Sequence, residues 1–410
     1  MMRSQVRRSA QVLAVGGVLL VWCAGPAGAA VTATKSGSTT VSILSDATAD
    51  TISVSCLSGN VAVNGTEVTT GGTVACTALT TYSVTAGGGM DTLSFGSVSA
   101  ITFPALVAVS AAIQDATADT YVGSQVKDSV IADGLDTVSG GAGDDYLEEG
   151  GTVDGGDGSD LIVNAHGAVT AGAGNDTIID PVSGPLNGGD GDDVVSFDLS
   201  RVDTLQPTSI VLTDITSSFD LGSGVGTAPT AAIEEYDLRL PDNHGAAQSV
   251  DARAFSGRTK VWSYGGADTL FGAAGTDVLD SGDGNDVISV RDGAVDVVRC
   301  GDGNDTVTAD RVDVLSGCEN VSLPAPDTSR ISGAKKVAQG EKAVFEFEST
   351  VTGSSFECRI DKAAFKACTS PFKVKTKKLK PGKHTVEVRA VAGSVDPTPS
   401  TLKFKVLPKQ

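Results

Sequence analysis

Short polar turns alternate with single aliphatic positions from Tyr264 to Cys318, at a period of about nine residues. Each unit contains a glycine-rich turn, an aspartate, one variable residue and an aliphatic residue. Because successive side chains of a strand point to opposite faces, each unit predicts a short strand with its aliphatic side chain inward. The aspartates are Asp268, Asp277, Asp286, Asp296, Asp305 and, in a degenerate unit, Asp313, and the aliphatic residues are Leu270, Leu279, Ile288, Val298, Val307 and Leu315.

This unit fits the nonapeptide G-G-x-G-x-D-x-U-x, so the stretch resembles the haemolysin-type, or repeats-in-toxin (RTX), calcium-binding family. The resemblance implies a parallel β-roll in which two units make one coil and several Ca²⁺ ions lie between stacked turns. Ca²⁺ takes six to eight oxygen ligands, which the turn carbonyls and aspartates can supply. A flexible Gly/Asp-rich linker is the alternative, and the unbroken aliphatic positions argue against it. The expected rows are Asp268, Asp286 and Asp305, and Asp277, Asp296 and Asp313.

A related array occupies residues 131–198, with units spaced by 15, 16 and 17 residues. Acid-poor pieces that begin at Gly151, Gly167 and Gly184 separate the units. We therefore expect one row of Ca²⁺ here and two rows in the array at 263–323. The predicted ligands of this array are Asp145, Asp160, Asp176 and Asp193, and the inward residues are Leu147, Ile162, Ile178 and Val195.

Residues 31–130 are rich in Thr, Val, Ser and Ala and contain short strand-like runs, which predict further solenoid coils. One calcium unit, GGGMDTL, is centred on Asp91, and ADTISV and ADTYV resemble the same unit without its glycines. We expect these coils to be mostly free of metal. Residues 199–262 are less regular and predict a β-rich insertion between the arrays.

The first 30 residues have the pattern of a secretory signal peptide, which predicts a secreted protein. Arg3, Arg7 and Arg8 precede an apolar run, and an A-x-A site places the cleavage near Ala29 or Ala30. The run is too short for a membrane span. A lipoprotein box at Leu20–Cys23 is a weaker interpretation, because a bulky tryptophan precedes the cysteine.

After a linker at 324–326, residues 327–410 show alternating strand patterns that predict a small antiparallel β-sandwich. This segment resembles immunoglobulin- or fibronectin-III-like modules of secreted repeat proteins. It carries 17 Lys and Arg against 8 Asp and Glu. Its lysines could contact anionic cell-surface or extracellular polymers, or could form a solvated basic face.

The formal net charge is −20, and residues 31–326 alone hold 10 basic and 42 acidic residues. Charge of this density repels itself unless cations neutralise it, although an acidic surface also serves solubility. Aromatic residues make up only 5% of the chain, so we expect thin aliphatic layers instead of an aromatic core. We expect no nucleic-acid partner.

Six cysteines remain after the signal segment, and an even number in an exported chain favours disulfides. Cys300 and Cys318 are one coil apart, within disulfide range across adjacent rungs. Cys56 and Cys76 are also about one coil apart, and Cys358 and Cys368 flank a predicted hairpin. A zinc site is the alternative, but the chain has no C-x-x-C motif and its three histidines are scattered.

The sequence therefore predicts an all-β protein, a parallel β-roll or β-helix solenoid followed by a small sandwich, with a binding or structural role. It contains neither H-E-x-x-H nor G-x-S-x-G, and it offers few histidines for acid–base chemistry. The acid pairs at 144–145 and 192–193 fall on repeat positions. An extracellular polysaccharide-binding or lyase-like β-helix protein remains the alternative.

Overall fold

The computed structural model describes residues 31–200, 209–214, 216–220, 225–241 and 245–409. The predicted signal peptide lies outside the described residues. The chain divides into two compact units, residues 1–193 and 194–410. The described residues form strands and one short 3₁₀ helix, Thr376–Lys378. Within these described ranges, no helix is long and apolar enough to cross a membrane.

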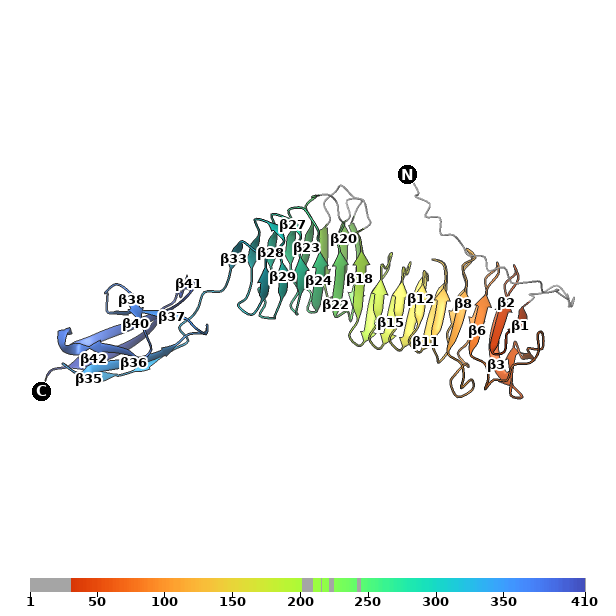
Figure 1. The fold of residues 1–410 in the computed structure, drawn as a ribbon, viewed down its shortest axis with the longest axis horizontal. Coiled ribbons are helices and arrows are strands. Elements are labelled where there is room, and N and C mark those ends of the chain that lie inside the picture. The colour runs from red at the N-terminus through yellow and green to blue at the C-terminus, as the bar shows by residue number, and fades with distance from the viewer. Residues whose placement is uncertain (1–30, 201–208, 215, 221–224, 242–244, 410) are drawn as a thin grey trace. The chain divides into compact units, whose positions relative to one another are not determined.

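The first unit is a parallel β-solenoid in which each coil adds one strand to each of two stacks (Figure 1). The parallel β-roll predicted from the repeats is confirmed. One stack contains β2 (Thr40–Leu44), β6 (Thr81–Thr85), β8 (Ala108–Ala112), β10 (Asp128–Ile131), β12 (Tyr146–Glu148), β14 (Leu161–Val163) and β16 (Thr177–Ile179). The other contains β3 (Thr51–Leu57), β7 (Thr92–Ser94), β9 (Thr120–Val122), β11 (Thr137–Ala142), β13 (Thr152–Asp157), β15 (Val169–Ala173) and β17 (Leu186–Asp190).

The strand register places the predicted aliphatic residues above one another. Leu147 of β12 pairs with Ile162 of β14, and Ile162 pairs with Ile178 of β16. All three are buried. The facing stack contributes an equivalent buried column from Val138, Val153 and Val169. The narrow core therefore consists of two facing aliphatic columns, as the period of the repeats predicts.

The N-terminal end of this unit differs from the expected thin aliphatic core. The rings of Phe103, Tyr82, Phe95 and Tyr121 are buried and, in this order, neighbouring ring centroids lie 5.6–6.0 Å apart. The equivalent aspartates Asp50, Asp91 and Asp119 are 41 and 28 residues apart. These coils are longer than the 15- to 17-residue coils that follow, and large rings pack in their core.

Antiparallel strands cover the first coil of this unit. β1 (Thr32–Ser36) pairs antiparallel with β2, and β4 (Asn60–Val63) connects β3 to β5 (Thr66–Glu67). A parallel solenoid otherwise ends in an open strand edge, which promotes association with other chains. The antiparallel strands therefore give the first coil a cap.

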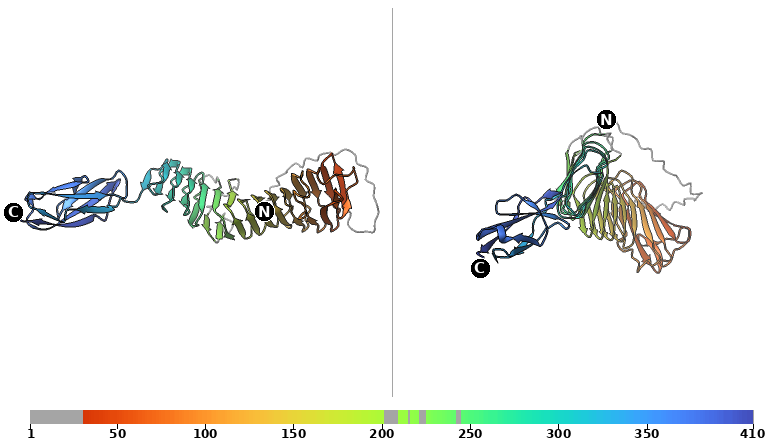
Figure 2. Two further views of the ribbon diagram at one scale, coloured as in Figure 1. Left: turned by 90° about the horizontal axis from the view of Figure 1, so that it is seen from below. Right: turned by 60° about the vertical axis from the view of Figure 1, so that its left-hand side comes forward.

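The second unit begins with another parallel solenoid (Figure 2). One stack contains β18 (Val194–Asp198), β22 (Glu235–Arg239), β24 (Arg258–Trp262), β26 (Val278–Asp280), β29 (Val297–Arg299) and β32 (Val314–Ser316). The other contains β19 (Ser209–Thr213), β23 (Ser249–Ala254), β25 (Thr269–Phe271), β28 (Val287–Ser289), β31 (Thr306–Thr308) and β33 (Asn320–Ser322). The first five inward residues predicted here are buried, and Leu315 in the final coil is half-buried.

Much of the segment 199–262, where we expected an irregular insertion, forms coils of this solenoid. β22 pairs parallel with both β18 and β24, and Tyr236 and Leu238 of β22 are buried. These coils lack Gly–Asp turns, so the nonapeptide pattern does not reveal them. An antiparallel excursion remains, in which β20 (Thr216–Asp220) pairs with β19 and with β21 (Val225–Ala231).

The C-terminal part of the second unit is the predicted β-sandwich. Its smaller sheet has the order β34 (Arg330–Gly333), β36 (Lys342–Glu348) and β39 (Phe372–Lys375). Phe345 and Phe347 of this sheet pack edge-on against Phe404 and Phe356 of the larger sheet, with centroids 5.1 and 4.8 Å apart. Neighbouring strands are antiparallel apart from β35 and β42. The larger sheet contains β35 (Lys336–Ala338), β42 (Ser400–Leu407), β40 (Gly382–Ala392), β37 (Ser355–Ile360) and β38 (Lys366–Cys368), with β41 (Ser394–Val395) beside β40.

Candidate metal centres

The repeat aspartates are connected to one another by hydrogen bonds between coils. The backbone N–H of Asp268 donates to Oδ1 of Asp286 at 2.8 Å, and the N–H of Asp286 donates to Oδ1 of Asp305 at 2.9 Å. We call such a row an aspartate ladder. The ladders are Asp268–Asp286–Asp305, Asp277–Asp296–Asp313, Asp128–Asp145–Asp160–Asp176–Asp193 and Asp50–Asp91–Asp119–Asp136.

The eleven predicted repeat aspartates lie on these ladders, and each is at most 2% exposed except Asp313, which is half-buried. The predicted register of the rows in the second array is therefore confirmed. The array at 131–198 has a ladder on one side through Asp145 to Asp193, while the other ladder of this unit ends at Asp136. The acid-poor turns at Gly151, Gly167 and Gly184 continue that second side.

Glycine is required in the turns that precede the ladders. A Cβ on Gly140 would lie 2.3 Å from Oδ2 of Asp145 and 2.4 Å from the carbonyl oxygen of Gly155 in the next coil. Gly156 has a φ of +107°, and a Cβ there would lie 2.1 Å from the carbonyl oxygen of Gly141. The missing side chains thus let a carboxylate and a carbonyl oxygen approach the same glycine.

One oxygen of most ladder carboxylates has no hydrogen-bond donor among the described residues. These oxygens are buried, and leaving a buried charged oxygen without a partner costs free energy. A hard cation that takes only oxygen ligands would remove this cost, so the donor set fits Ca²⁺. The atoms are the Oδ2 oxygens of Asp145, Asp160, Asp176, Asp268, Asp277, Asp286, Asp296 and Asp305.

Burial also makes the ladder carboxylates resist ionisation when no cation is present. Desolvation, together with the neighbouring carboxylates of Asp128 and Asp160, raises the pKa of Asp145 to about 8. Desolvation raises the pKa of Asp296 to about 7 and the pKa of Asp268 to about 6. A bound divalent cation would favour the ionised forms of these groups.

The protein supplies few cations of its own to the first unit. Residues 31–193 contain two lysines and no arginine, against 21 Asp and Glu. Neither Lys35 nor Lys127 forms an ion pair with a described residue, and the Lys35 ammonium donates instead to the carbonyl of Thr73. Neutralisation of this unit therefore depends on ions from solution.

Sequence reasoning missed several residues that the structure places beside the ladders. Asp128 escaped notice because its unit keeps only the first glycine of the repeat, Gly123, although the D-x-V spacing was present. Asp115 and Asp292 lie four residues before Asp119 and Asp296 and join carboxylate clusters with them. The spacing D-x-x-x-D marks both, although it also occurs at Asp46–Asp50 and Asp176–Asp180.

The three predicted disulfides are confirmed. Cys56–Cys76, Cys300–Cys318 and Cys358–Cys368 are bonded, with Cα atoms 6.0, 5.3 and 5.8 Å apart. Cys300–Cys318 connects adjacent rungs at the C-terminal end of the solenoid. Since these six cysteines are paired, none of them is available as a zinc ligand.

The glycine turns, the aspartate ladders and the inward aliphatic columns are the parts of one known repeat. The family model described as RTX calcium-binding nonapeptide repeat (4 copies) matches residues 132–148 and 262–295. The chain carries RTX calcium-binding repeats. The matched RTX segments contain Asp136, Asp145, Asp268, Asp277 and Asp286, all of which are ladder residues. No curated protein matches the chain.

Proposed function

We propose that the chain is a secreted, non-enzymatic protein whose β-roll is stabilised after export by Ca²⁺ bound between stacked turns. The observation that carries this proposal is the row of buried carboxylate oxygens without hydrogen-bond donors along the ladders. The ligands would be the Oδ2 atoms together with turn carbonyls. The Oδ2 atoms without a donor belong to Asp145, Asp160, Asp176, Asp268, Asp277, Asp286, Asp296 and Asp305. Asp193 and Asp91 are proposed as ligands from their places on the ladders, and Oδ2 of Asp91 also accepts the hydroxyl of Ser45 at 2.7 Å.

Calorimetric titration and thermal melts of the mature chain test this proposal. Calcium binds the stacked carboxylates and not the unfolded chain, so it should raise the Tm by mass action. We expect several ions per chain and a melting temperature that falls on addition of EGTA. An unchanged Tm with and without EGTA, together with no heat of binding, would contradict the proposal.

Export is supported by the three disulfides, because such bonds form and persist in oxidising compartments. The predicted signal peptide is consistent with them. N-terminal sequencing of protein from the culture medium should begin near Ala30 or Val31. Protein that retains Met1 in the medium would contradict cleavage.

The absence of catalytic chemistry is part of the proposal. The Asp144–Asp145 pair resembles a glycosidase dyad in sequence, but Asp145 is a buried ladder residue whose Oδ1 accepts the N–H of Asp128. His384 is held on both ring nitrogens, by Asp361 and by the carbonyl of Lys380. Depolymerisation of polyuronate substrates by the calcium-loaded chain would favour the lyase-like alternative.

A second role, binding of anionic polymers, is supported by one feature of the sandwich. Lys405 of β42 lies directly beside Lys336 of β35 and Lys383 of β40, and all three side chains are exposed. Like charges directly opposite on neighbouring strands repel each other, and a polyanion relieves that repulsion. We call these three residues the lysine strip.

Binding of heparin and polygalacturonate, used as probes, tests the lysine strip. The triple variant Lys336→Gln, Lys383→Gln, Lys405→Gln should bind them at least tenfold more weakly. A control triple, Lys362→Gln, Lys366→Gln, Lys378→Gln, removes the same charge elsewhere in the sandwich and should bind as the wild type does. Equal loss in both triples would assign the binding to net charge alone.

A further inference from the structure

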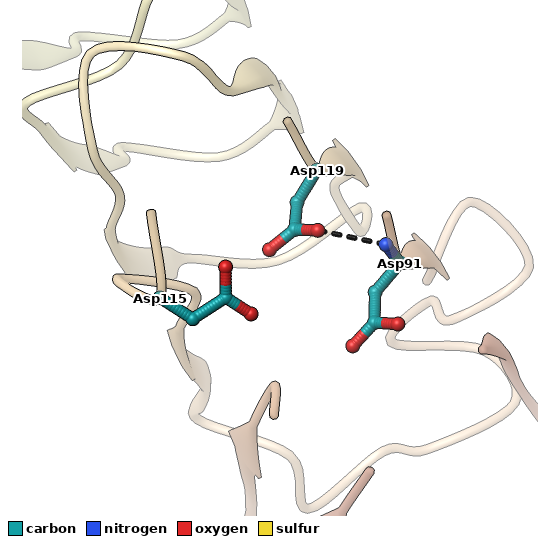
Figure 3. Close-up of side chains that lie close together, drawn as sticks. All are labelled: Asp91, Asp115 and Asp119. Carbon is teal, nitrogen blue, oxygen red and sulfur yellow. Dashed lines mark hydrogen bonds between the residues drawn. The ribbon is translucent and has the colours of Figure 1, made fainter. Parts of the chain in front are cut away.

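A carboxylate cluster lies in the N-terminal coils, outside the segments that match the repeat model. Asp91, Asp115 and Asp119 each offer one oxygen, and these oxygens lie within 4.8 Å of one another. Oxygens that surround one Ca²⁺ at 2.3–2.6 Å are separated by distances of this order. Figure 3 shows the three side chains converging from two successive coils.

Asp119 directs an unsatisfied oxygen into this cluster. Its side chain is 2% exposed, and its Oδ1 accepts the backbone N–H of Asp91 at 2.7 Å. Its Oδ2 has no donor among the described residues and points toward Asp115 (Figure 3). Oδ2 of Asp115 is buried and lacks a donor as well. Each of these two carboxylates therefore keeps one buried oxygen that no described donor reaches.

A hydroxyl group at the edge of the cluster cannot satisfy the oxygens around it. Oγ1 of Thr117 lies 2.5 Å from the Gly89 carbonyl oxygen, 2.5 Å from Oδ1 of Asp115 and 3.5 Å from Oδ1 of Asp119. A hydroxyl has one proton to donate, so three acceptors share it. The surplus of oxygen lone pairs is the environment that a hard cation requires.

The same arrangement recurs in the second unit. Asp277, Asp292 and Asp296 also bring three carboxylate oxygens within 4.8 Å. Each cluster contains two consecutive aspartates of one ladder. Its third carboxylate belongs to the aspartate four positions before the later of these two. That residue closes its own turn, since Asp115 accepts the N–H of Thr117 and Asp292 accepts the N–H of Ala294.

We propose that Asp91, Asp115 and Asp119 form a Ca²⁺ site that uses a D-x-x-x-D turn in place of a glycine-rich nonapeptide. Asp115 and Asp119 supply carboxylate oxygens from one turn, and Asp91 supplies one from the preceding coil. The inference rests on the proposed function in two respects only, the choice of Ca²⁺ as the ion and the role of Asp91 as a ligand. It gives the N-terminal coils a metal where the sequence led us to expect almost none.

The chain contains its own control for this site. The hexapeptide DATADT occurs at 46–51 and again at 115–120. Asp46 accepts the N–H and the hydroxyl of Thr48, as Asp115 does from Thr117. Asp50, however, is the first residue of its ladder, so no ladder carboxylate precedes it as Asp91 precedes Asp119. Asp46→Asn thus makes the same local change outside the cluster.

Calcium stoichiometry of the full mature chain, measured by equilibrium dialysis with radioactive calcium, tests the site. Asp115→Asn keeps the oxygen that closes the turn and removes the charge. It should lose one ion per chain or weaken one site at least tenfold, while Asp46→Asn should match the wild type. Asp119→Asn should affect the same single ion, so the double variant should lose one ion and not two.

Wild-type stoichiometry and affinity in Asp115→Asn would overturn the inference, as would equal losses in Asp46→Asn and Asp115→Asn. Asp286→Asn separates this failure from failure of the proposed function. If Asp286→Asn loses calcium and Asp115→Asn does not, only the N-terminal site is wrong. If the wild-type chain binds no calcium, both proposals are wrong. Circular dichroism of each variant verifies that the fold is retained.

Discussion

The backbone N–H of Asp268 donates to Oδ1 of Asp286 at 2.8 Å, although 18 residues separate the two in the sequence. The same carboxylate leaves its Oδ2 buried without a donor. One side chain therefore has two functions, since Oδ1 holds the preceding coil in register and Oδ2 is available to a cation. Substitutions at Asp286 can separate these functions.

Asp286→Asn should retain the calcium-free stability and lose part of the stabilisation by calcium, because the amide oxygen still accepts the N–H of Asp268. Asp286→Ala should lose both and leave that N–H without an acceptor, at a cost of roughly 1–3 kcal/mol. Asp313, half-buried in the final coil, is the control, and Asp313→Ala should have the smaller effect. Thermal melts with and without calcium measure both quantities. An Asn variant with full calcium stabilisation would contradict the ligand role.

The calcium-free chain should lose stability as the pH rises. Burial raises the pKa of Asp160 and of Asp277 to about 6 and that of Asp145 to about 8, above the ordinary value of 3.8. A raised folded-state pKa contributes stability that is present below pH 3.8 and is lost as the pH passes through the folded value. In EGTA, the Tm should therefore fall between pH 5 and pH 8.5.

Calcium should reverse this trend, because the ion binds the deprotonated carboxylates. The difference in Tm between calcium and EGTA should widen from pH 5 to pH 8.5. Melts in matched buffers across this range provide the test. A calcium-free Tm that rises over the same interval would show that the ladder carboxylates are ionised without a cation.

Gly156→Ala should disrupt the stacking of the turns in the first array. Its φ of +107° disfavours any side chain, and the added Cβ would lie 2.1 Å from a backbone oxygen. We expect the free energy of unfolding to fall by roughly 3 kcal/mol, which is at the upper end of the cost of overpacking a core. Gly293 is the matched control, with a φ of +96° and open space around its Cβ position. If urea denaturation shows equal losses for both alanine variants, the close approach of the coils is not what requires glycine.

The Cys300–Cys318 bond should hold the last coil of the solenoid against fraying. It closes a loop of 18 residues, for which the chain-entropy model gives about 3 kcal/mol. Replacing both cysteines with serine should increase hydrogen exchange in β32 and β33. The corresponding change at Cys358 and Cys368 should leave the exchange of these strands unaltered. Free thiols at 300 and 318 in a peptide map of the oxidised protein would contradict the register.

The repeat period determined much of this architecture from the sequence alone. An aspartate followed at the second position by an aliphatic residue was sufficient to place Leu270 above Ile288 and Asp268 above Asp286. It succeeded because the parallel register repeats, so one local unit defines both the aliphatic column and the aspartate ladder. The disulfide between Cys300 and Cys318 followed from the same coil length.

The sequence was less informative where the coils lose their glycines. The strand that carries Tyr236 has an ordinary alternating pattern, so its place in the solenoid depends on neighbours that are distant in sequence. The aromatic cluster around Tyr82 likewise joins rings from different coils, which no local pattern encodes. Asp115 is brought to Asp91 by a coil of irregular length, and only the fold reveals that they meet.

Hydrogen exchange of the mature chain, measured by mass spectrometry with calcium and with EGTA, tests most directly whether calcium stabilises the β-roll. Ordering the glycine-rich turns costs backbone entropy, and stacked carboxylates repel each other without a cation. Removal of calcium should therefore expose residues 264–314, which hold two ladders, before the single-ladder array at 131–193. The sandwich at 327–410, with its own aromatic core and disulfide, should stay protected. Equal exchange in both arrays with and without EGTA would contradict a stabilising role of calcium in this fold.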